Sequence, residues 1–111
     1  MTLRLEWSAY FAADVERRVD WYREQAGPEI AEQFVACVRS TLTALCRTPG
    51  LGRPRFLDWP ELGSMRSFRV ERPFHRHLIF YRFDGSRLLA ERQIHGARDL
   101  PRRLTDSPFE E

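Results

Sequence analysis

The hydrophobic and polar positions at the start of the chain follow two different periods. Leu3, Leu5 and Trp7 alternate with polar residues, which predicts a half-buried strand. Over residues 9–26 the apolar positions instead recur every three or four residues, the spacing that keeps them on one face of a helix. These positions are Phe11, Val15, Val19, Tyr22 and Ala26. We therefore expect a short strand followed directly by an amphipathic helix.

A glycine and a proline separate this helix from a second one. Gly27 can end a helix in a left-handed conformation, and Pro28 is favoured at the first position of the next helix. The second helix should run to about Arg47, because Pro49-Gly50 stops it. Its apolar stripe comprises Ile30 or Ala31, Phe34, Val35, Val38, Leu42 and Leu45. Such a short link between two helices predicts an antiparallel hairpin.

Three strands are predicted in the second half of the chain. Residues 65–71 alternate in polarity, whereas residues 77–83 form a nearly continuous apolar and aromatic run that is typical of a central strand. Asp84-Gly85 supplies the turn of a hairpin. The last strand covers residues 88–94. Together these segments predict a three-stranded antiparallel meander.

The remaining segments complete one domain. Residues 49–63 are rich in Gly, Pro and Arg and predict an ordered loop, and residues 98–104 predict a short helical turn interrupted by Pro101. A chain of 111 residues can bury one core and is too short for two. We expect a single α+β domain over residues 1–111, of order β-α-α-β-β-β. The helical hairpin should pack on one face of a small, mainly antiparallel sheet, and the other face should stay open.

Composition indicates a cytoplasmic protein that needs no cofactor. No run of about 18 apolar residues and no secretory signal is visible, so we expect neither a membrane span nor export. Cys37 and Cys46 lack a metal-binding spacing and are expected to be buried thiols. Glycine-rich phosphate loops and the common hydrolase motifs are missing as well.

The positive charge gathers in the middle of the sequence. Residues 1–45 carry five arginines and seven acids, residues 46–103 carry thirteen and six, and residues 104–111 carry only three acids. All of the basic residues other than histidine are arginine, which suits bidentate contact with phosphate or carboxylate. The arginines predicted on the meander and on the loop before it are Arg53, Arg55, Arg69, Arg72, Arg76, Arg82, Arg92 and Arg98. Each can be a solvated surface residue, but together they could hold a polyanion or an acidic partner.

The three histidines, His75, His77 and His95, all fall in or beside the meander. Two of them could face each other across the sheet as acid and base, or could ligate a metal, but metal sites usually need three or more ligands with a hydrogen-bonded second shell. We therefore expect no metal. A structural role at the strand end, with a hydrogen bond to the backbone, is the simpler interpretation of His95.

Several motifs nevertheless form a recognisable pattern. Two helices precede Met65-Arg66-Ser67-Phe68-Arg69-Val70, then Leu78-Ile79-Phe80-Tyr81-Arg82 with an acidic-Gly turn, and finally Ile94-His95-Gly96-Ala97-Arg98-Asp99. This arrangement spans nearly the whole chain and resembles the ParE branch of the RelE/ParE toxin superfamily. The last of these stretches is the most specific part.

The resemblance implies a growth-inhibiting toxin of a type II toxin-antitoxin system, of the kind that stabilises plasmids. A small ParD-like antitoxin, expected to have a ribbon-helix-helix fold, would neutralise it in a hetero-oligomeric complex, and DNA gyrase would be its target. The target-binding residues expected on this basis are Arg69, Arg98 and Asp99. The expected antitoxin-binding residues are Phe11, Val15, Arg53, Arg55, Arg76 and Arg82. On this interpretation the protein is a binding inhibitor and need not be an enzyme.

The alternative is the RelE branch, which cuts messenger RNA on the ribosome. Its candidate catalytic residues here are Arg69, Arg76, His77, His95 and Arg98. Two positions depart from that branch, because Leu104 stands where the branch has a tyrosine and Leu78 where it has an arginine. A third hypothesis is an inert module that keeps only the antitoxin contact.

Overall fold

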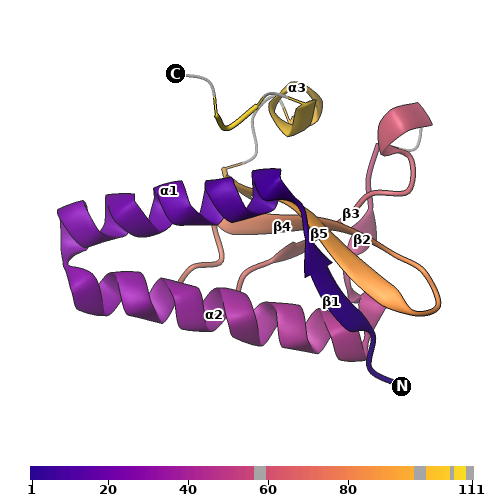
Figure 1. Cartoon of the computed structure of the whole chain (residues 1–111), viewed down its shortest axis with the longest axis horizontal. Coiled ribbons are helices and arrows are strands. Elements are labelled where there is room, and N and C mark those ends of the chain that lie inside the picture. The colour runs from indigo at the N-terminus through magenta and orange to yellow at the C-terminus, as the bar shows by residue number, and fades with distance from the viewer. Residues whose placement is uncertain (57–59, 97–99, 106, 110–111) are drawn as a thin grey trace.

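The computed structural model of the protein describes residues 1–56, 60–96, 100–105 and 107–109, and Figure 1 shows its two long helices lying side by side against a sheet. The helices are α1 (Ala9–Ala26), α2 (Pro28–Arg47) and the short α3 (Leu100–Thr105). The strands are β1 (Arg4–Trp7), β2 (Arg53–Pro54), β3 (Arg66–Arg69), β4 (His77–Phe83) and β5 (Arg87–His95). Single turns of 3-10 helix cover Pro49–Leu51 and Pro60–Leu62. The predicted α+β class and the helical hairpin are confirmed.

The sheet follows the order β1-β5-β4-β3-β2 within the described part of the chain. Strand β1 is parallel to β5, and all other neighbours are antiparallel. Strand β2 falls inside the segment that was predicted to be a loop, because two residues are too few to show an alternating pattern. Strand β3 is also shorter than the predicted segment 65–71. No helix in the described residues is long and apolar enough to cross a membrane.

Local capping explains why both long helices begin and end where the sequence predicts. The Ser8 hydroxyl accepts a hydrogen bond from the Phe11 amide at 3.0 Å and donates one to the Glu91 carbonyl at 2.8 Å. It therefore both starts α1 and fastens that start to β5. Gly27 has φ of 95°, a value that favours glycine, and Pro28 opens α2 directly after it.

Two hydrophobic clusters lie on opposite faces of the sheet. Side chains such as Phe34, Leu45 and Ile79 form the larger one, between the helical hairpin and the sheet. The second cluster consists of Leu62, Met65, Leu78, Phe80, Ile94 and Leu104. Because Phe80 alternates with Ile79 along β4, this second cluster lies on the face away from α1 and α2. The prediction that this face stays open was therefore wrong over the part that α3 and the 60–65 segment cover.

The burial of the cysteines differs from the prediction at one position. Cys46 is 4% exposed and belongs to the larger core, whereas Cys37 is only partly buried at the edge of that core. Both are free thiols. Burial raises the pKa of each thiol, most plainly at Cys46, where it is the sole cause.

A buried ion pair joins α1 to the second half of β5. Strand β1 ends at Trp7, which pairs with Ala90, so the edge of β5 beyond that point faces α1. There the Asp14 carboxylate accepts two hydrogen bonds from the Arg92 guanidinium, at 2.8 and 2.9 Å, and a third from the Gln93 amide at 3.0 Å. The Asp14 and Arg92 side chains are 8% and 7% exposed. Asp14 thus accepts a hydrogen bond from a backbone amide on the part of the β5 edge that β1 does not cover.

We predict that Asp14→Asn lowers the free energy of unfolding by about 3–5 kcal/mol, because it leaves the buried Arg92 guanidinium without its counter-charge. The matched control is Asp20→Asn on the same helix. Asp20 pairs with Arg23 at 3.0 Å, but both side chains are more than half exposed, so its loss should cost less than about 1 kcal/mol. Urea denaturation measures both values. Equal losses in the two variants would contradict the structural role of Asp14.

Candidate functional site

Three of the arginines singled out from the sequence meet in one pocket at the β2–β3 end of the sheet. Arg53, Arg55 and Arg69 line a volume of about 360 Å³ together with Leu51, Ser67, Phe68 and Leu78. We call this pocket the arginine groove. Arg69 pairs with Leu78 and Ser67 with Phe80, and both partners belong to the second core. The groove therefore lies on the sheet face opposite the helical hairpin.

Strand pairing and one buried tyrosine position the groove. Arg53 pairs with Ser67, whose hydroxyl accepts a hydrogen bond from Arg55 Nε at 2.7 Å. The Tyr81 hydroxyl accepts from the Gly52 amide at 2.9 Å and donates to a carbonyl in the preceding 3-10 turn at 2.6 Å. Because Tyr81 is fully buried, these bonds hold the backbone just before β2 against the sheet. Gly52 is required there, because an added Cβ would collide with the Tyr81 ring and hydroxyl.

The charges on the described residues that line the groove are all of one sign. None of the described residues that line it is acidic. The pKa of Arg55 is lowered, first by burial and then by the positive charges of Arg53 and Arg69. Clustered guanidinium groups of this kind favour an anion, either a carboxylate or a phosphate, because both accept bidentate hydrogen bonds. Arg69 also donates to the His75 carbonyl at 3.1 Å, which fixes the direction of its side chain.

The two histidines considered as proton carriers lie on the other face of the sheet. His77 and His95 pair across β4 and β5, and their ring centroids are 4.6 Å apart. His77 is 1% exposed and packs against aromatic residues of the larger core. Its two ring nitrogens contact the Tyr22 hydroxyl and the Gln93 side-chain amide, each at 2.8 Å. Its environment is that of a structural residue.

Burial also changes the acidity of His77. Its pKa falls to about 3, mainly because burial penalises the charged ring and secondarily because His95 and Arg18 are nearby. A ring that remains neutral through the physiological range cannot serve as a general acid near neutral pH.

The other predicted site residues are dispersed. Phe11 is 4% exposed and belongs to the larger core, so its side chain presents no surface to a partner, whereas Val15 is partly buried against the same core. Arg76 is exposed. Arg82 is tied to Glu91 at 3.0 Å and to the Ser64 hydroxyl. Arg98 and Asp99 lie outside the described residues.

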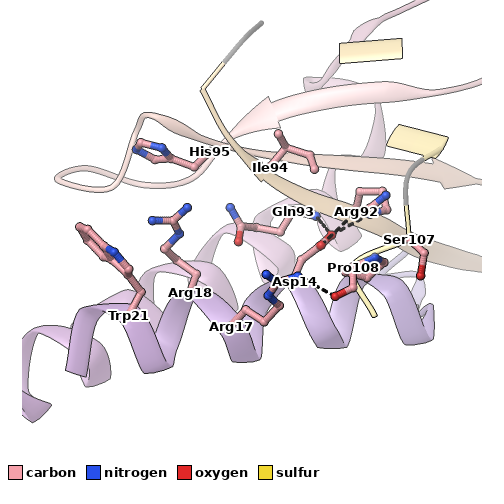
Figure 2. A pocket seen from close by; sticks show the side chains of 10 residues that line it. All are labelled: Asp14, Arg17, Arg18, Trp21, Arg92, Gln93, Ile94, His95, Ser107 and Pro108. Carbon is pink, nitrogen blue, oxygen red and sulfur yellow. Dashed lines mark hydrogen bonds and ion pairs between the residues drawn. The ribbon is translucent and has the colours of Figure 1, made fainter. Parts of the chain in front are cut away.

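Sequence reasoning missed a second pocket, between α1 and the edge of β5 (Figure 2). Its walls include Arg17, Arg18 and Trp21 from α1 and His95 from β5. The available signal was a pair of adjacent arginines followed by a tryptophan three positions after Arg18. Residues three apart on a helix share a face. That spacing does not reveal that these α1 side chains lie next to β5.

We predict that His77 contributes a pH-dependent term to stability. Its folded pKa of about 3 lies below the ordinary value of 6.5, so between these pH values the unfolded chain binds more protons. The contribution is therefore complete above pH 6.5 and is lost as the pH falls toward 3. In urea denaturation, the stability of the wild type relative to His77→Gln should shrink progressively from neutral pH to about pH 4. A difference that does not change with pH would contradict the assignment.

Comparison with known proteins identifies the family. Residues 5–100 match the family model described as "ParE toxin of type II toxin-antitoxin system, parDE". No curated protein matches the chain.

Two solved structures resemble the fold. The chromosomal ParDE toxin-antitoxin system from P. aeruginosa matches with a TM-score of 0.69 at 24% identity, over 86% of this chain and 98% of that one. The RelBE2 toxin-antitoxin complex from Mycobacterium tuberculosis matches with a TM-score of 0.57 at 19% identity, over 86% and 99%. These likenesses support the fold, and the family model covers most of the sequence. The chain therefore belongs to the ParE toxin family of type II toxin-antitoxin systems.

Proposed function

We propose that this ParE toxin acts in the bacterial cytoplasm by binding DNA gyrase, without chemistry of its own. In this proposal the arginine groove is the target-binding surface. Arg69 is the groove residue that would bind the target, and Arg98 and Asp99, which follow β5 in the sequence, are the other two proposed target-binding residues. The gyrase assignment comes from the family resemblance, and the groove supplies charged groups that could recognise carboxylates on a protein target.

The observation that best supports binding over RNA cleavage is the separation of the groove arginines from His77 and His95. A ribonuclease needs a proton carrier within hydrogen-bond reach of the group it activates. Here Arg53, Arg55 and Arg69 line one face of the sheet, whereas His77 and His95 pair on the other. The set Arg69, Arg76, His77, His95 and Arg98 is therefore a weak basis for the RelE-like alternative.

We also propose that a ParD-like antitoxin of ribbon-helix-helix type neutralises the toxin by covering the same groove. Arg53 and Arg55 would bind its acidic residues, with Arg76 and Arg82 on the flanks. Arg53 and Arg55 share the groove with Arg69. An antitoxin held by the first two arginines would thus cover the third and block the target-binding surface directly.

We expect the purified toxin to inhibit supercoiling by gyrase and to leave ribosome-bound messenger RNA intact. Arg69→Gln should raise the concentration needed for half-inhibition by about tenfold, because it removes a charge-assisted contact in a partly desolvated groove. Arg39→Gln is the matched control, since Arg39 is exposed on α2, away from the groove. Its effect should stay within about twofold.

The opposite pattern would overturn this assignment. Unimpaired supercoiling together with toxin-dependent cleavage of ribosome-bound messenger would favour the RelE-like alternative. Unimpaired supercoiling with intact messenger would favour an inert module that binds only its antitoxin.

The antitoxin is expected to be encoded next to the toxin gene, and its complex provides a second test. Arg53→Glu and Arg55→Glu should each weaken antitoxin binding by about tenfold or more, because each reverses a charge that faces acidic residues. Arg39→Glu, with the same charge change on the helical side, should have little effect. Titration calorimetry measures the dissociation constants. If all three substitutions weaken binding equally, the antitoxin is held by net charge and not by the groove.

A further inference from the structure

Phe56, the residue directly after Arg55, has a backbone conformation that bulky residues rarely adopt. Its φ is 58°, in the left-handed region, where the backbone crowds the Cβ atom of an L-residue. Among the described residues it is the sole non-glycine residue with a positive φ. Strain of this kind persists only when the surrounding structure holds it, and it is concentrated at functional sites.

The ring of Phe56 shows what holds this conformation. Successive side chains of an extended strand point to opposite faces of a sheet, so the residue after Arg55 would ordinarily point toward the helical hairpin. The Phe56 ring packs instead against the second cluster and stacks on Phe80, with ring centroids 6.3 Å apart and an interplanar angle of 25°. Phe80 is fully buried. The left-handed turn therefore brings the Phe56 ring to the same sheet face as the Arg55 side chain.

Arg55 is held at its backbone and at its side chain. Its amide donates a hydrogen bond to the Met65 carbonyl at 2.9 Å, and its Nε donates at 2.7 Å to the hydroxyl of Ser67, which is only 4% exposed. Ser67 pairs with Phe80 across β3 and β4. The hydroxyl that accepts from Arg55 is therefore next to the ring on which Phe56 stacks.

One torsion connects these two anchors. With the Phe56 ring fixed against the second cluster, φ of Phe56 sets the plane of the peptide group that joins it to Arg55. Rotation to a negative φ would either withdraw the ring from the cluster or turn this peptide group. The second movement would pull Arg55 Nε away from the Ser67 hydroxyl.

An anchor is needed because the neighbouring charges oppose the position of Arg55. Arg53 and Arg69 line the same groove and repel its guanidinium, which is also partly desolvated. Among the described residues, Ser67 is the sole hydrogen-bond partner of this guanidinium, and it takes only Nε. The two terminal nitrogens can therefore both donate to one carboxylate of a partner.

We propose that Phe56 is a positioning residue of the arginine groove, because its ring and its left-handed backbone hold Arg55 in place to bind a carboxylate of the antitoxin. The identity of the carboxylate rests on the proposed function, whereas the position of Arg55 does not. Phe56 need not touch the partner, since it acts through the residue before it.

Proton exchange at the Arg55 side chain tests this position in the isolated toxin. The Nε proton, identified in nitrogen-correlated NMR spectra by its loss in Arg55→Gln, should exchange slowly with water because Ser67 accepts its hydrogen bond. Phe56→Ala should speed this exchange by about tenfold or more, because the torsion can then relax and the bond can open.

Ile94→Ala is the matched control. Ile94 is a second-cluster side chain that is 5% exposed and does not line the groove, so its truncation loosens the same core at a distance from Arg55. It should change the exchange rate by less than about twofold. Phe56→Leu, which keeps an apolar side chain, should speed the exchange by a smaller factor than Phe56→Ala, and it supplies the test should Phe56→Ala not fold.

Glycine tests the strain itself. Glycine is ordinarily less favourable than alanine in an ordered segment, but it adopts a positive φ without a steric cost. Phe56→Gly should therefore unfold at a higher urea concentration than Phe56→Ala, although both variants lack the ring. The reverse order would show that the left-handed backbone at this position is not strained.

Antitoxin binding, followed by titration calorimetry, tests the consequence for the groove. Arg55→Gln and Phe56→Ala should raise the dissociation constant by about tenfold and about fivefold. The double variant should match Arg55→Gln alone, because Phe56 acts through Arg55. Effects that multiply in the double variant would contradict this.

The two measurements separate failure of this inference from failure of the proposed function. An exchange rate at Arg55 that Phe56→Ala leaves unchanged, or that Ile94→Ala raises equally, would overturn the inference even if Arg55→Gln weakens antitoxin binding. If the exchange rate responds as expected but Arg55→Gln leaves antitoxin binding intact, the position of Arg55 stands and the proposed role of the groove is overturned.

Discussion

The buried pair of Asp14 and Arg92 is the contact on which the rest of the molecule depends. Strand β5 pairs with β1 over its first half only, and α1 covers the rest of its edge through the Asp14 carboxylate. Arg92 extends the link to the Leu104 carbonyl, so the same guanidinium holds α1, β5 and α3 together. This charged contact is almost fully withdrawn from water and links elements that pack on the two faces of the sheet.

The protein has two basic surfaces with different chemistry. On the face away from the hairpin, the arginine groove presents Arg53, Arg55 and Arg69, and the described residues that line it include no Trp or Tyr. On the helical side, Arg17 and Arg18 stand beside the exposed Trp21. The arginine groove suits acidic groups on proteins.

Features that depend on neighbouring residues could be predicted from the sequence, and features that join distant residues could not. Both long helices have the predicted bounds, because Ser8, Gly27 and Pro28 act locally. The arginines of the groove could be named from charge alone, but their convergence depends on β2, which is too short to leave a pattern. Phe11 and Val15 were assigned to a partner surface, yet the same periodicity that revealed α1 also places them in the core. Asp14 and Arg92 are 78 positions apart, and no local signal pairs them.

In the proposed function, the arginine groove is the surface of this ParE toxin that binds gyrase. Hydrogen-deuterium exchange of the toxin, alone and bound to gyrase, tests it most directly, because backbone amides covered by a partner exchange more slowly. Peptides spanning residues 53–56 and 66–69 should be protected in the complex with gyrase, whereas the outward face of α2 should show no change. Protection confined to α1 and α2, with unchanged exchange in β2 and β3, would contradict it.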